Sequence, residues 1–346
     1  MRLSLKLIFF AVGLLFIKLS FAQNNSAKTF TNPLLITGPD PWVIQHNNIY
    51  YFTRSTGRNL QIIATKKMSE LSIAKPVTIW TPPDTGRYSK EIWAPELHYL
   101  DGKWYMYFAA DNGDNHNHRM YVLENSDTNP LSQNWKFKGQ VYDATNKWAI
   151  DATVFTYQGK NYFVWSGWEG DENVSQNIYI AKLANPWTIE GERVMLSHPQ
   201  YDWEKHGSGN GFPVVNEGPE ILQNPKGDIF LTYSASGCWT DDYSLGLLSL
   251  KRGGNPMNPN DWQKSITPVF TKSIENSVYG PGHNGFFKSI DAKEDWIIYH
   301  ANPKPGQGCA NFRSVRMQKI TWNKDYTPNF GIPQKNGTAQ KVPSGE

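Results

Sequence analysis

The sequence is poor in the features that mark several large classes of protein. It has two cysteines in 346 residues, 19% charged residues, and no helical hydrophobic pattern longer than one or two turns. Two cysteines are too few for the disulfide network of a small secreted scaffold, so the fold must depend on a hydrophobic core. Low charge beside 39% hydrophobic residues excludes a disordered chain. After residue 22, no apolar run is long enough to span a bilayer.

The first 22 residues have the layout of a secretory signal. Arg2 and Lys6 precede an apolar run over residues 7–19, and residues 20–22 form a small-x-small cleavage site. We therefore expect a mature chain of residues 23–346 that is secreted or periplasmic. We expect it to make no contact with a membrane after cleavage.

Removal of the signal also removes the net charge. The full chain has 34 basic and 31 acidic residues, and the signal contains three of the basic residues and none of the acidic ones. Subtracting those three leaves 31 basic against 31 acidic residues in the mature chain. A neutral protein gives no reason to expect nucleic acid or an anionic membrane as a partner.

Aromatic residues are abundant, with 14 Trp, 17 Tyr and 17 Phe, and they favour strands over helices. Five segments share one plan: a polar residue beside Pro, Ala or Asn, an apolar strand, a short turn and an aromatic-rich strand. The spacing between them is roughly 61 residues, which suits one four-stranded sheet with its loops. The segments begin at Asp40, Ala94, Asp151, Glu217 and His283.

This repeat predicts an all-β fold, a five-bladed β-propeller formed by residues 23–346 as a single domain without linkers. A sandwich or a barrel fits one plan repeated at this period poorly. The chain after about residue 334 is rich in Gly, Lys, Ser and Pro, and we expect it to be flexible.

In a propeller the innermost strands line a central channel, so equivalent positions of the five blades converge at its mouth. The repeat thus brings Asp40, Asp151, Glu217 and His283 to one cavity, while Ala94 leaves room for a substrate. A single Asp before Pro is usually a solvated turn residue. Three converging carboxylates repel one another, however, and that cost indicates a function or a bound cation. Two carboxylates across a cavity are the machinery of glycoside hydrolysis.

The same residues carry a resemblance to glycoside hydrolase family 43, whose members are five-bladed propellers and inverting enzymes. The segments GPDPWV, WAIDATVF and NEGPEIL match its three catalytic motifs in order, within a resemblance that runs from about residue 32 to residue 333. It implies that Asp40 is the general base, Glu217 the general acid, and Asp151 the residue that raises the pKa of the acid and orients it. Glu220 competes for the role of acid, but only Glu217 fits the Glu-Gly-Pro motif.

Other positions are candidates for substrate binding. Trp42 lies beside the proposed base and Trp93 lies in a WAPEL segment common in the family; for both, packing between blades is the alternative. Arg313 is preferred to Arg316 as the arginine that reaches the catalytic centre, because in one strand the two would face opposite sides. His283, in GPGHNGFF, matches a histidine that in many relatives helps to hold a cation, often calcium through water.

The alternative for His283 is a histidine hydrogen-bonded to water in the channel, and we expect no cofactor to be required. His116 and His118 lie in a loop without strong third ligands, so we interpret them as loop residues that line the cleft. Cys238 and Cys309 follow the aromatic strands of the fourth and fifth repeats. Because these loops correspond, adjacent blades bring them close, and we hypothesise a disulfide.

Within the family, the segments WSGWEG, YSASGCWTDDYSLG and NFGIPQ are most similar to exo-acting α-L-arabinofuranosidases. The resemblance implies release of terminal α-L-arabinofuranose from arabinan or another arabinose-containing polysaccharide of plant cell walls. An endo-α-1,5-L-arabinanase and a β-xylosidase are the alternatives in the same family. A non-catalytic carbohydrate-binding propeller is the alternative of another class, and the presence of all three acids argues against it.

Overall fold

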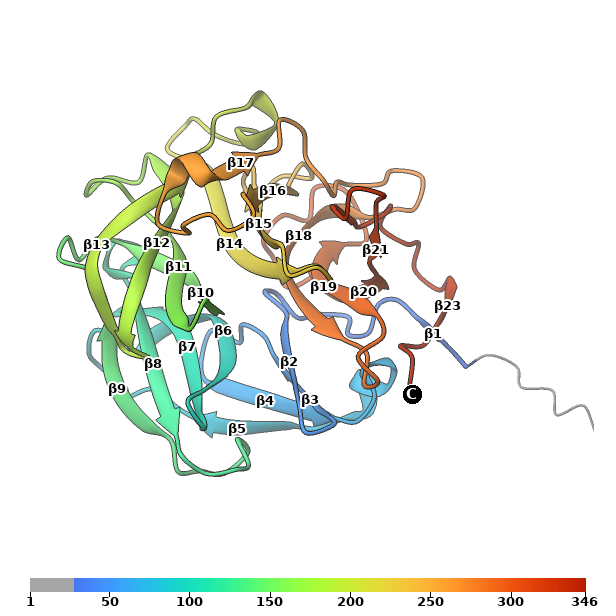
Figure 1. Cartoon of the computed structure of the whole chain (residues 1–346), viewed down its shortest axis with the longest axis horizontal. Helices are drawn as coiled ribbons and strands as arrows, with labels where there is room; N and C mark the ends of the chain where they lie inside the picture. The colour runs from blue at the N-terminus through green and yellow to red at the C-terminus, as the bar shows by residue number, and fades with distance from the viewer. Residues whose placement is uncertain (1–27) are drawn as a thin grey trace, which may run out of the picture.

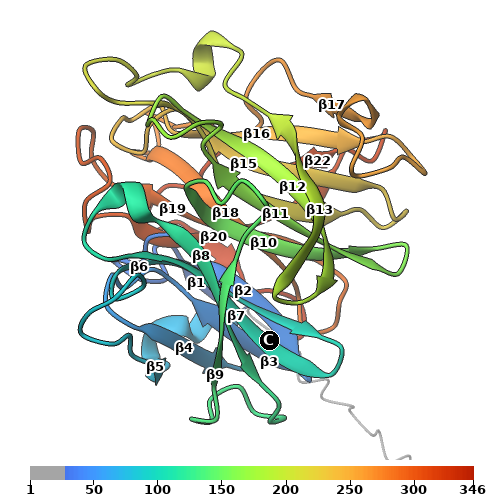
Figure 2. The same cartoon turned by 90° about the vertical axis from the view of Figure 1, so that its left-hand side faces the viewer.

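The computed structural model describes residues 28–346, and the predicted signal at residues 1–22 lies outside them. Five antiparallel blades surround a central axis, each with its first strand innermost (Figure 1), which confirms the predicted all-β, five-bladed propeller. Figure 2 shows the blades from the side, with the third blade facing the viewer. Within residues 28–346, no helix has the length and apolarity needed to cross a membrane.

The first four blades each have four strands. Blade 1 comprises β2 (Trp42–His46), β3 (Ile49–Thr53), β4 (Leu60–Thr65) and β5 (Pro76–Trp80), and blade 2 comprises β6 (Lys90–Leu100), β7 (Lys103–Asp111), β8 (Arg119–Asn125) and β9 (Lys136–Val141). Blade 3 comprises β10 (Ala149–Tyr157), β11 (Lys160–Gly167), β12 (Ser175–Asn185) and β13 (Thr188–Ser197), and blade 4 comprises β14 (Val214–Gln223), β15 (Ile229–Ala235), β16 (Ser244–Leu250) and β17 (Trp262–Lys264).

Blade 5 comprises β18 (Tyr279–Lys288), β19 (Asp295–Asn302) and β20 (Ser314–Lys319), and the chain preceding blade 1 completes it. The Leu34 amide donates to the Val315 carbonyl at 2.8 Å, and the Val315 amide donates to the Leu35 carbonyl at 2.9 Å. The N-terminal segment therefore takes the fourth position of the last blade and closes the ring.

Short elements complete the described chain. Four 3-10 helices lie in the loops: η1 (Met68–Ile73), η2 (Asn115–Asn117), η3 (Asp202–Glu204) and η4 (Pro259–Asp261). The remaining strands form two small pairs, β1 (Thr29–Thr31) with β23 (Ala339–Lys341) and β21 (Thr321–Trp322) with β22 (Pro328–Asn329).

The aromatic-rich second strands explain how the blades pack. Along β7, Tyr105 and Tyr107 point into the hydrophobic cluster shared with blade 3, while Trp104 and Phe108 point into the cluster shared with blade 1. Successive side chains of a strand face opposite sides, so a strand between two other blades is buried on both. Large aromatic side chains fill the wedge-shaped space between adjacent blades and hold the five sheets around one axis.

The structure corrects the expectation that the chain after about residue 334 is loose. β23 pairs with β1 along its whole length, and the Glu346 carboxylate accepts hydrogen bonds from the Met68 and Ser69 amides at 2.8 and 3.3 Å. The C-terminal segment has no hydrophobic periodicity from which a strand could be predicted. Its order comes from main-chain pairing and from a carboxylate at the start of η1, where free amides are available.

Candidate active site

The site is built on a kink that recurs at the start of every innermost strand. In blades 2 to 5 the register with the second strand shifts there, as it does between Ile150 and Thr153. One residue of each kink has a positive φ, between 41° and 57°, a conformation that costs free energy for any residue but glycine. These five residues are Asp40, Ala94, Asp151, Gly218 and His283.

Gly218 in this set corrects the predicted register of blade 4. Glu217 pairs with Ser234 in the same way as Ile150 pairs with Ser166, so it occupies the position before the kink. Trp93 holds the corresponding position in blade 2 and, like Glu217, lines the cavity at the channel mouth. The general acid predicted from the sequence thus reaches the cavity from one residue earlier than Asp40 and Asp151 do.

Asp40 is held as an ionised carboxylate. Burial alone would raise its pKa, but the charges of neighbouring groups, Arg313 among them, together with a hydrogen bond from Ser55, hold the pKa below its ordinary value. Arg313 Nη1 lies 3.2 Å from Oδ1, and His283 Nδ1 lies 3.3 Å from the same oxygen. The Asp40 amide donates to His300 Nδ1 at 3.1 Å, so that nitrogen carries no proton and His300 is neutral. Arg313 supplies the permanent positive charge.

Glu217 has the opposite electrostatic environment. Removal from water raises its pKa to about 7, and the charge of Asp40 adds to this, while a hydrogen bond from the Tyr243 hydroxyl at 2.7 Å opposes it. Tyr243 is fully buried and stacks on His300, with ring centroids 5.7 Å apart. A carboxyl with this pKa is protonated over the acidic range and can give its proton to a leaving oxygen.

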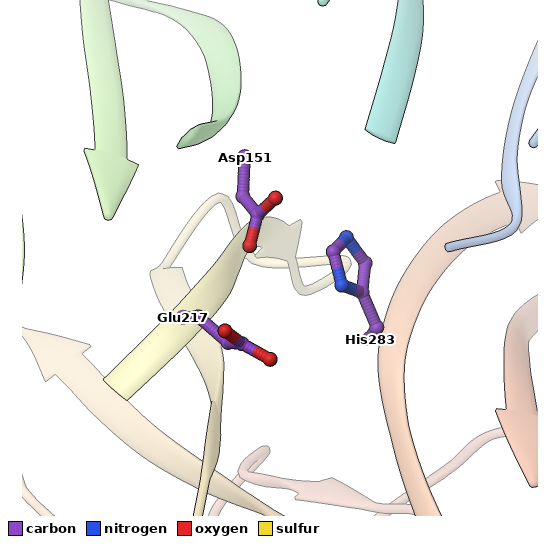
Figure 3. A group of neighbouring side chains, drawn as sticks. All are labelled: Asp151, Glu217 and His283. Carbon is purple, nitrogen blue, oxygen red and sulfur yellow. The ribbon is translucent and has the colours of Figure 1, made fainter. Parts of the chain in front are cut away.

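Asp151 completes the group of carboxyls. It is 4% exposed, accepts a hydrogen bond from the Gly218 amide at 3.2 Å, and has a pKa raised well above the ordinary value by burial and by the charge of Glu217. Ligand atoms of Asp151, Glu217 and His283 lie within 4.8 Å of one another, and Figure 3 shows the three side chains pointing toward a common centre. Two carboxyls this close cannot both ionise cheaply, which favours the protonated form of Asp151.

The cavity over these residues has a volume of about 910 Å³ and contains the three predicted acids, His283, Arg313 and Trp93. Trp93 stacks on His118, whose ring centroid is 4.1 Å away. Arg316 is fully buried and donates to the Gln334 carbonyl at 3.3 Å, so Arg313 is the arginine that enters the site.

Trp42 and Glu220 lie elsewhere, and the prediction that Trp42 lines the sugar pocket is wrong. The residue is 8% exposed, and its ring centroid lies 4.8 Å from that of His98. It lines a second cavity of about 380 Å³ together with Glu220. The kink at Asp40 breaks the strand alternation, so the residue two positions later does not share its direction. Glu220 faces this second cavity, which removes it as a candidate acid.

His118 is also placed differently from the prediction. It is fully buried, with Nδ1 3.0 Å from Asp111 Oδ2, and it supports Trp93 from beneath instead of lining the cleft. His116 is exposed and interacts with Asp114, with Nδ1 3.2 Å from Oδ1. Sequence reasoning missed Ser55, Tyr243 and His300, because no motif or spacing marks a residue that supports a catalytic group from another strand.

The predicted disulfide is confirmed. Cys238 and Cys309 are bonded, with Cα atoms 5.3 Å apart, and the bridge joins the loop after β15 to the loop after β19. Both cysteines line the cavity. The bond therefore fixes blades 4 and 5 to each other at the edge of the candidate site.

The donor set does not fit a directly coordinated calcium ion. Ca²⁺ takes six to eight oxygen ligands, whereas Asp151, Glu217 and His283 offer two carboxyls and one nitrogen. The pKa of both carboxyls is raised by burial, so a cation would have to displace their protons.

An ionised carboxylate and a protonated carboxyl facing one cavity of a propeller channel define the site as that of a glycoside hydrolase. Residues 30–328 match the family described as glycosyl hydrolases family 43, and the chain belongs to that family.

Individual proteins that are similar to this chain are glycoside hydrolases by name. The chain is 41% identical over 325 residues to an extracellular exo-α-(1→5)-L-arabinofuranosidase of Streptomyces avermitilis, covering 91% of this chain and 66% of that protein. It is 40% identical to a protein of the same name from Streptomyces chartreusis, with coverage of 79% and 82%. The crystal structure of an α-L-arabinofuranosidase from Lactobacillus brevis superposes with a TM-score of 0.83 at 38% identity, covering 89% of this chain and 98% of that one. The chain thus spans just under two thirds of the Streptomyces avermitilis relative.

Proposed function

We propose that the protein is an inverting, exo-acting α-L-arabinofuranosidase that releases terminal arabinofuranose from arabinan or a related plant polysaccharide. The observation that carries this proposal is the opposed ionisation of two carboxyls on one cavity. Asp40 is held ionised by Arg313, whereas the pKa of Glu217 is raised to about 7. A base and an acid with separated pKa values are what a single displacement requires at mildly acidic pH.

The reaction proceeds in one step. Asp40 accepts a proton from a water molecule as that oxygen attacks the anomeric carbon of the terminal arabinofuranose. The glycosidic bond breaks through an oxocarbenium-like transition state, and Glu217 gives its proton to the departing oxygen. Asp151 lies beside Glu217 and keeps a proton on the pair, and Arg313 orients Asp40. The products are arabinose of inverted configuration and a chain shorter by one residue.

Exo action and the α-1,5 linkage rest on the relatives. The two Streptomyces proteins are named exo-α-(1→5)-L-arabinofuranosidases, and the Lactobacillus brevis structure is that of an α-L-arabinofuranosidase. We extend that substrate class to this chain. We also propose action outside the cytoplasm, since a disulfide persists in oxidising compartments and the two Streptomyces relatives are named extracellular.

Product analysis tests the proposal. The protein is incubated with linear α-1,5-arabinan, sugar-beet arabinan and arabinoxylan, and the products are separated by chromatography. Free arabinose as the sole product from at least one polymer is the expected result, with NMR showing that β-arabinose forms first. A ladder of arabino-oligosaccharides would indicate an endo-arabinanase, and xylose would indicate a xylosidase. No product at all would favour a binding propeller.

We further propose that no metal is needed for catalysis and that any cation in the channel is structural, held through water by His283. We therefore expect chelation with EDTA to leave kcat unchanged within about twofold. Metal content measured by mass spectrometry, together with Tm before and after chelation, checks this. A fall in kcat that added Ca²⁺ restores, without a change in Tm, would contradict it.

A further inference from the structure

Two aromatic side chains at the edge of the cavity have no part in the mechanism above. Trp239 and Phe212 both line the cavity, and their ring centroids are 4.8 Å apart. Phe212 is 52% exposed although it is a large hydrophobic residue. Aromatic faces left open at the rim of a polar cavity suit a ligand with an apolar face, such as a sugar ring.

The Trp239 ring is fixed in place. Its indole Nε1 donates to the Gly207 carbonyl at 2.9 Å. A Cβ added at Gly207 would lie 2.6 Å from that nitrogen, and one added at Gly237 would lie 2.1 Å from the ring. Both glycines are therefore needed to seat the indole. A ring that is already immobilised loses little entropy when a ligand stacks on it.

The segment that carries Trp239 is held to the neighbouring blade. The Cys238–Cys309 disulfide precedes it directly, and the Gly306 amide donates to Asp241 Oδ1 at 2.8 Å. Gly308 packs against the Trp239 backbone, where a Cβ would lie 3.4 Å from the Trp239 Cα. The blade 5 loop thus contacts the segment that carries the ring.

The position of this pair relative to the acid decides which sugar it meets. Phe212 lies just before β14, the strand that carries Glu217, and Trp239 lies on the segment that leads to Tyr243, the hydrogen-bond partner of Glu217. Both rings line the same cavity as Glu217, and they come from the blade that carries it or from the loop that leads to that blade. A general acid stands beside the oxygen that departs, so this side of the cavity is where a leaving group would lie.

We propose that Trp239 and Phe212 form the stacking platform for the sugar next to the scissile bond, on the leaving-group side, and that the Cys238–Cys309 disulfide holds this platform in place. The inference rests on the proposed glycosidase function and adds to it a binding site for the leaving sugar. It predicts that the platform is engaged by a disaccharide but not by a substrate whose leaving group is a single atom.

The experiment compares α-1,5-L-arabinobiose with α-L-arabinofuranosyl fluoride, in wild type and Trp239→Ala. We expect the ratio of the two kcat/KM values, disaccharide over fluoride, to fall at least about tenfold in the variant, which is about 1.4 kcal/mol of selective binding. Trp239→Phe should restore most of the ratio, and Phe212→Ala should lower it less. Phe312→Ala is the matched control: this side chain is 55% exposed on the loop that carries Cys309, and we expect no change.

Equal losses on both substrates in Trp239→Ala would overturn the platform, because they would mean that Trp239 supports the arabinose pocket or the fold. If Trp239→Ala unfolds, the disaccharide-to-fluoride ratios of Trp239→Phe and Phe212→Ala test the proposal in its place. A ratio in Phe212→Ala equal to that of wild type would then contradict the proposal. If the wild type hydrolyses neither the disaccharide nor the fluoride, the proposed function is rejected instead. The Cys238→Ser/Cys309→Ser double variant should lower the ratio in the same direction as Trp239→Ala.

Discussion

At the scale of single residues, the two reacting carboxyls are each held by a hydroxyl from another part of the chain. Ser55 donates to Asp40 and accepts from the Ala94 amide at 2.6 Å, while Tyr243 donates to Glu217. Ser55 binds Asp40 Oδ2 while Arg313 donates to Oδ1, and Tyr243 binds Glu217 Oε1. The division of work between base and acid thus depends on neighbours as much as on the carboxyls themselves.

Replacing either reacting carboxyl tests its role directly. In Glu217→Gln and in Asp40→Asn we expect kcat on arabinobiose to fall by about 100- to 10,000-fold, because one proton transfer is lost while the shape is kept. In Glu217→Gln the Tm should not fall, because only a proton is lost. Asp40→Asn should lower Tm without unfolding the protein, because it removes the negative charge that faces Arg313. Circular dichroism and initial rates check this. Turnover near that of wild type in either variant would reject the assignment.

The hydrogen bond from Tyr243 should be visible in the pH profile. This bond lowers the pKa of Glu217, so Tyr243→Phe should raise it above its value of about 7. The acid must be protonated to act, and the alkaline limb of kcat/KM should therefore move to higher pH. Tyr50→Phe is the matched control, because Tyr50 is a buried tyrosine that donates to the Lys288 carbonyl. An alkaline limb that does not move in Tyr243→Phe would contradict this prediction.

At the scale of elements, the second strands of the blades and the closure of the ring differ in how far the sequence reveals them. The aromatic-rich runs at residues 104–108 and 162–165 predict strands, and β7 and β11 lie there. The pairing of Leu34 and Leu35 with β20 and the β1–β23 pair carry no such signal. Main-chain hydrogen bonds between distant segments depend on where those segments lie in the folded protein. The pattern of side chains in one sequence does not predict that position.

The kinks show the same limit within the site. The motifs identify Asp40, Asp151 and Glu217, but they place Glu217 where the structure has Gly218. A one-residue shift changes which side of the strand a side chain faces. The kink at Asp40, which has a φ of 56°, likewise turns Trp42 away from the cavity. Residue types in the motifs thus identify the catalytic carboxyls. The direction in which each side chain points depends on the backbone geometry of the kinks.

The contribution of the C-terminal strand can be measured by truncation. Deletion of residues 339–346 removes the β1–β23 pair and the contacts of Glu346 with the Met68 and Ser69 amides. We expect Tm to fall by roughly 5 °C, as for a loss of about 2 kcal/mol in a domain of this size. Turnover at low temperature should persist, because the segment is remote from the cavity. Glu346→Gln, which keeps the strand, should give a smaller shift, and an unchanged Tm in the truncated chain would show that the pairing adds no stability.

At the scale of the whole molecule, the propeller buries further acids outside the catalytic group. Glu96 and Glu220 are both buried, Glu96 Oε2 lies 2.8 Å from His98 Nε2, and Glu220 lines the second cavity. Burial raises the pKa of Glu220 to about 8 and that of Glu96 above its ordinary value. The fold therefore holds protons in its channel that an unfolded chain would release at neutral pH.

This excess of bound protons makes the stability of the protein fall with rising pH. Between pH 4.5, the ordinary pKa of Glu220, and about pH 8, its value in the fold, the native state binds more protons than the unfolded state. Each pH unit in that window costs about 1.4 kcal/mol per such group. Glu220→Gln keeps the shape of the side chain but has no proton to lose. Its free energy of unfolding relative to wild type should therefore be higher at pH 8 than at pH 5. Urea denaturation at the two values measures this, and a difference between variant and wild type that is the same at both would show that Glu220 does not titrate in the fold.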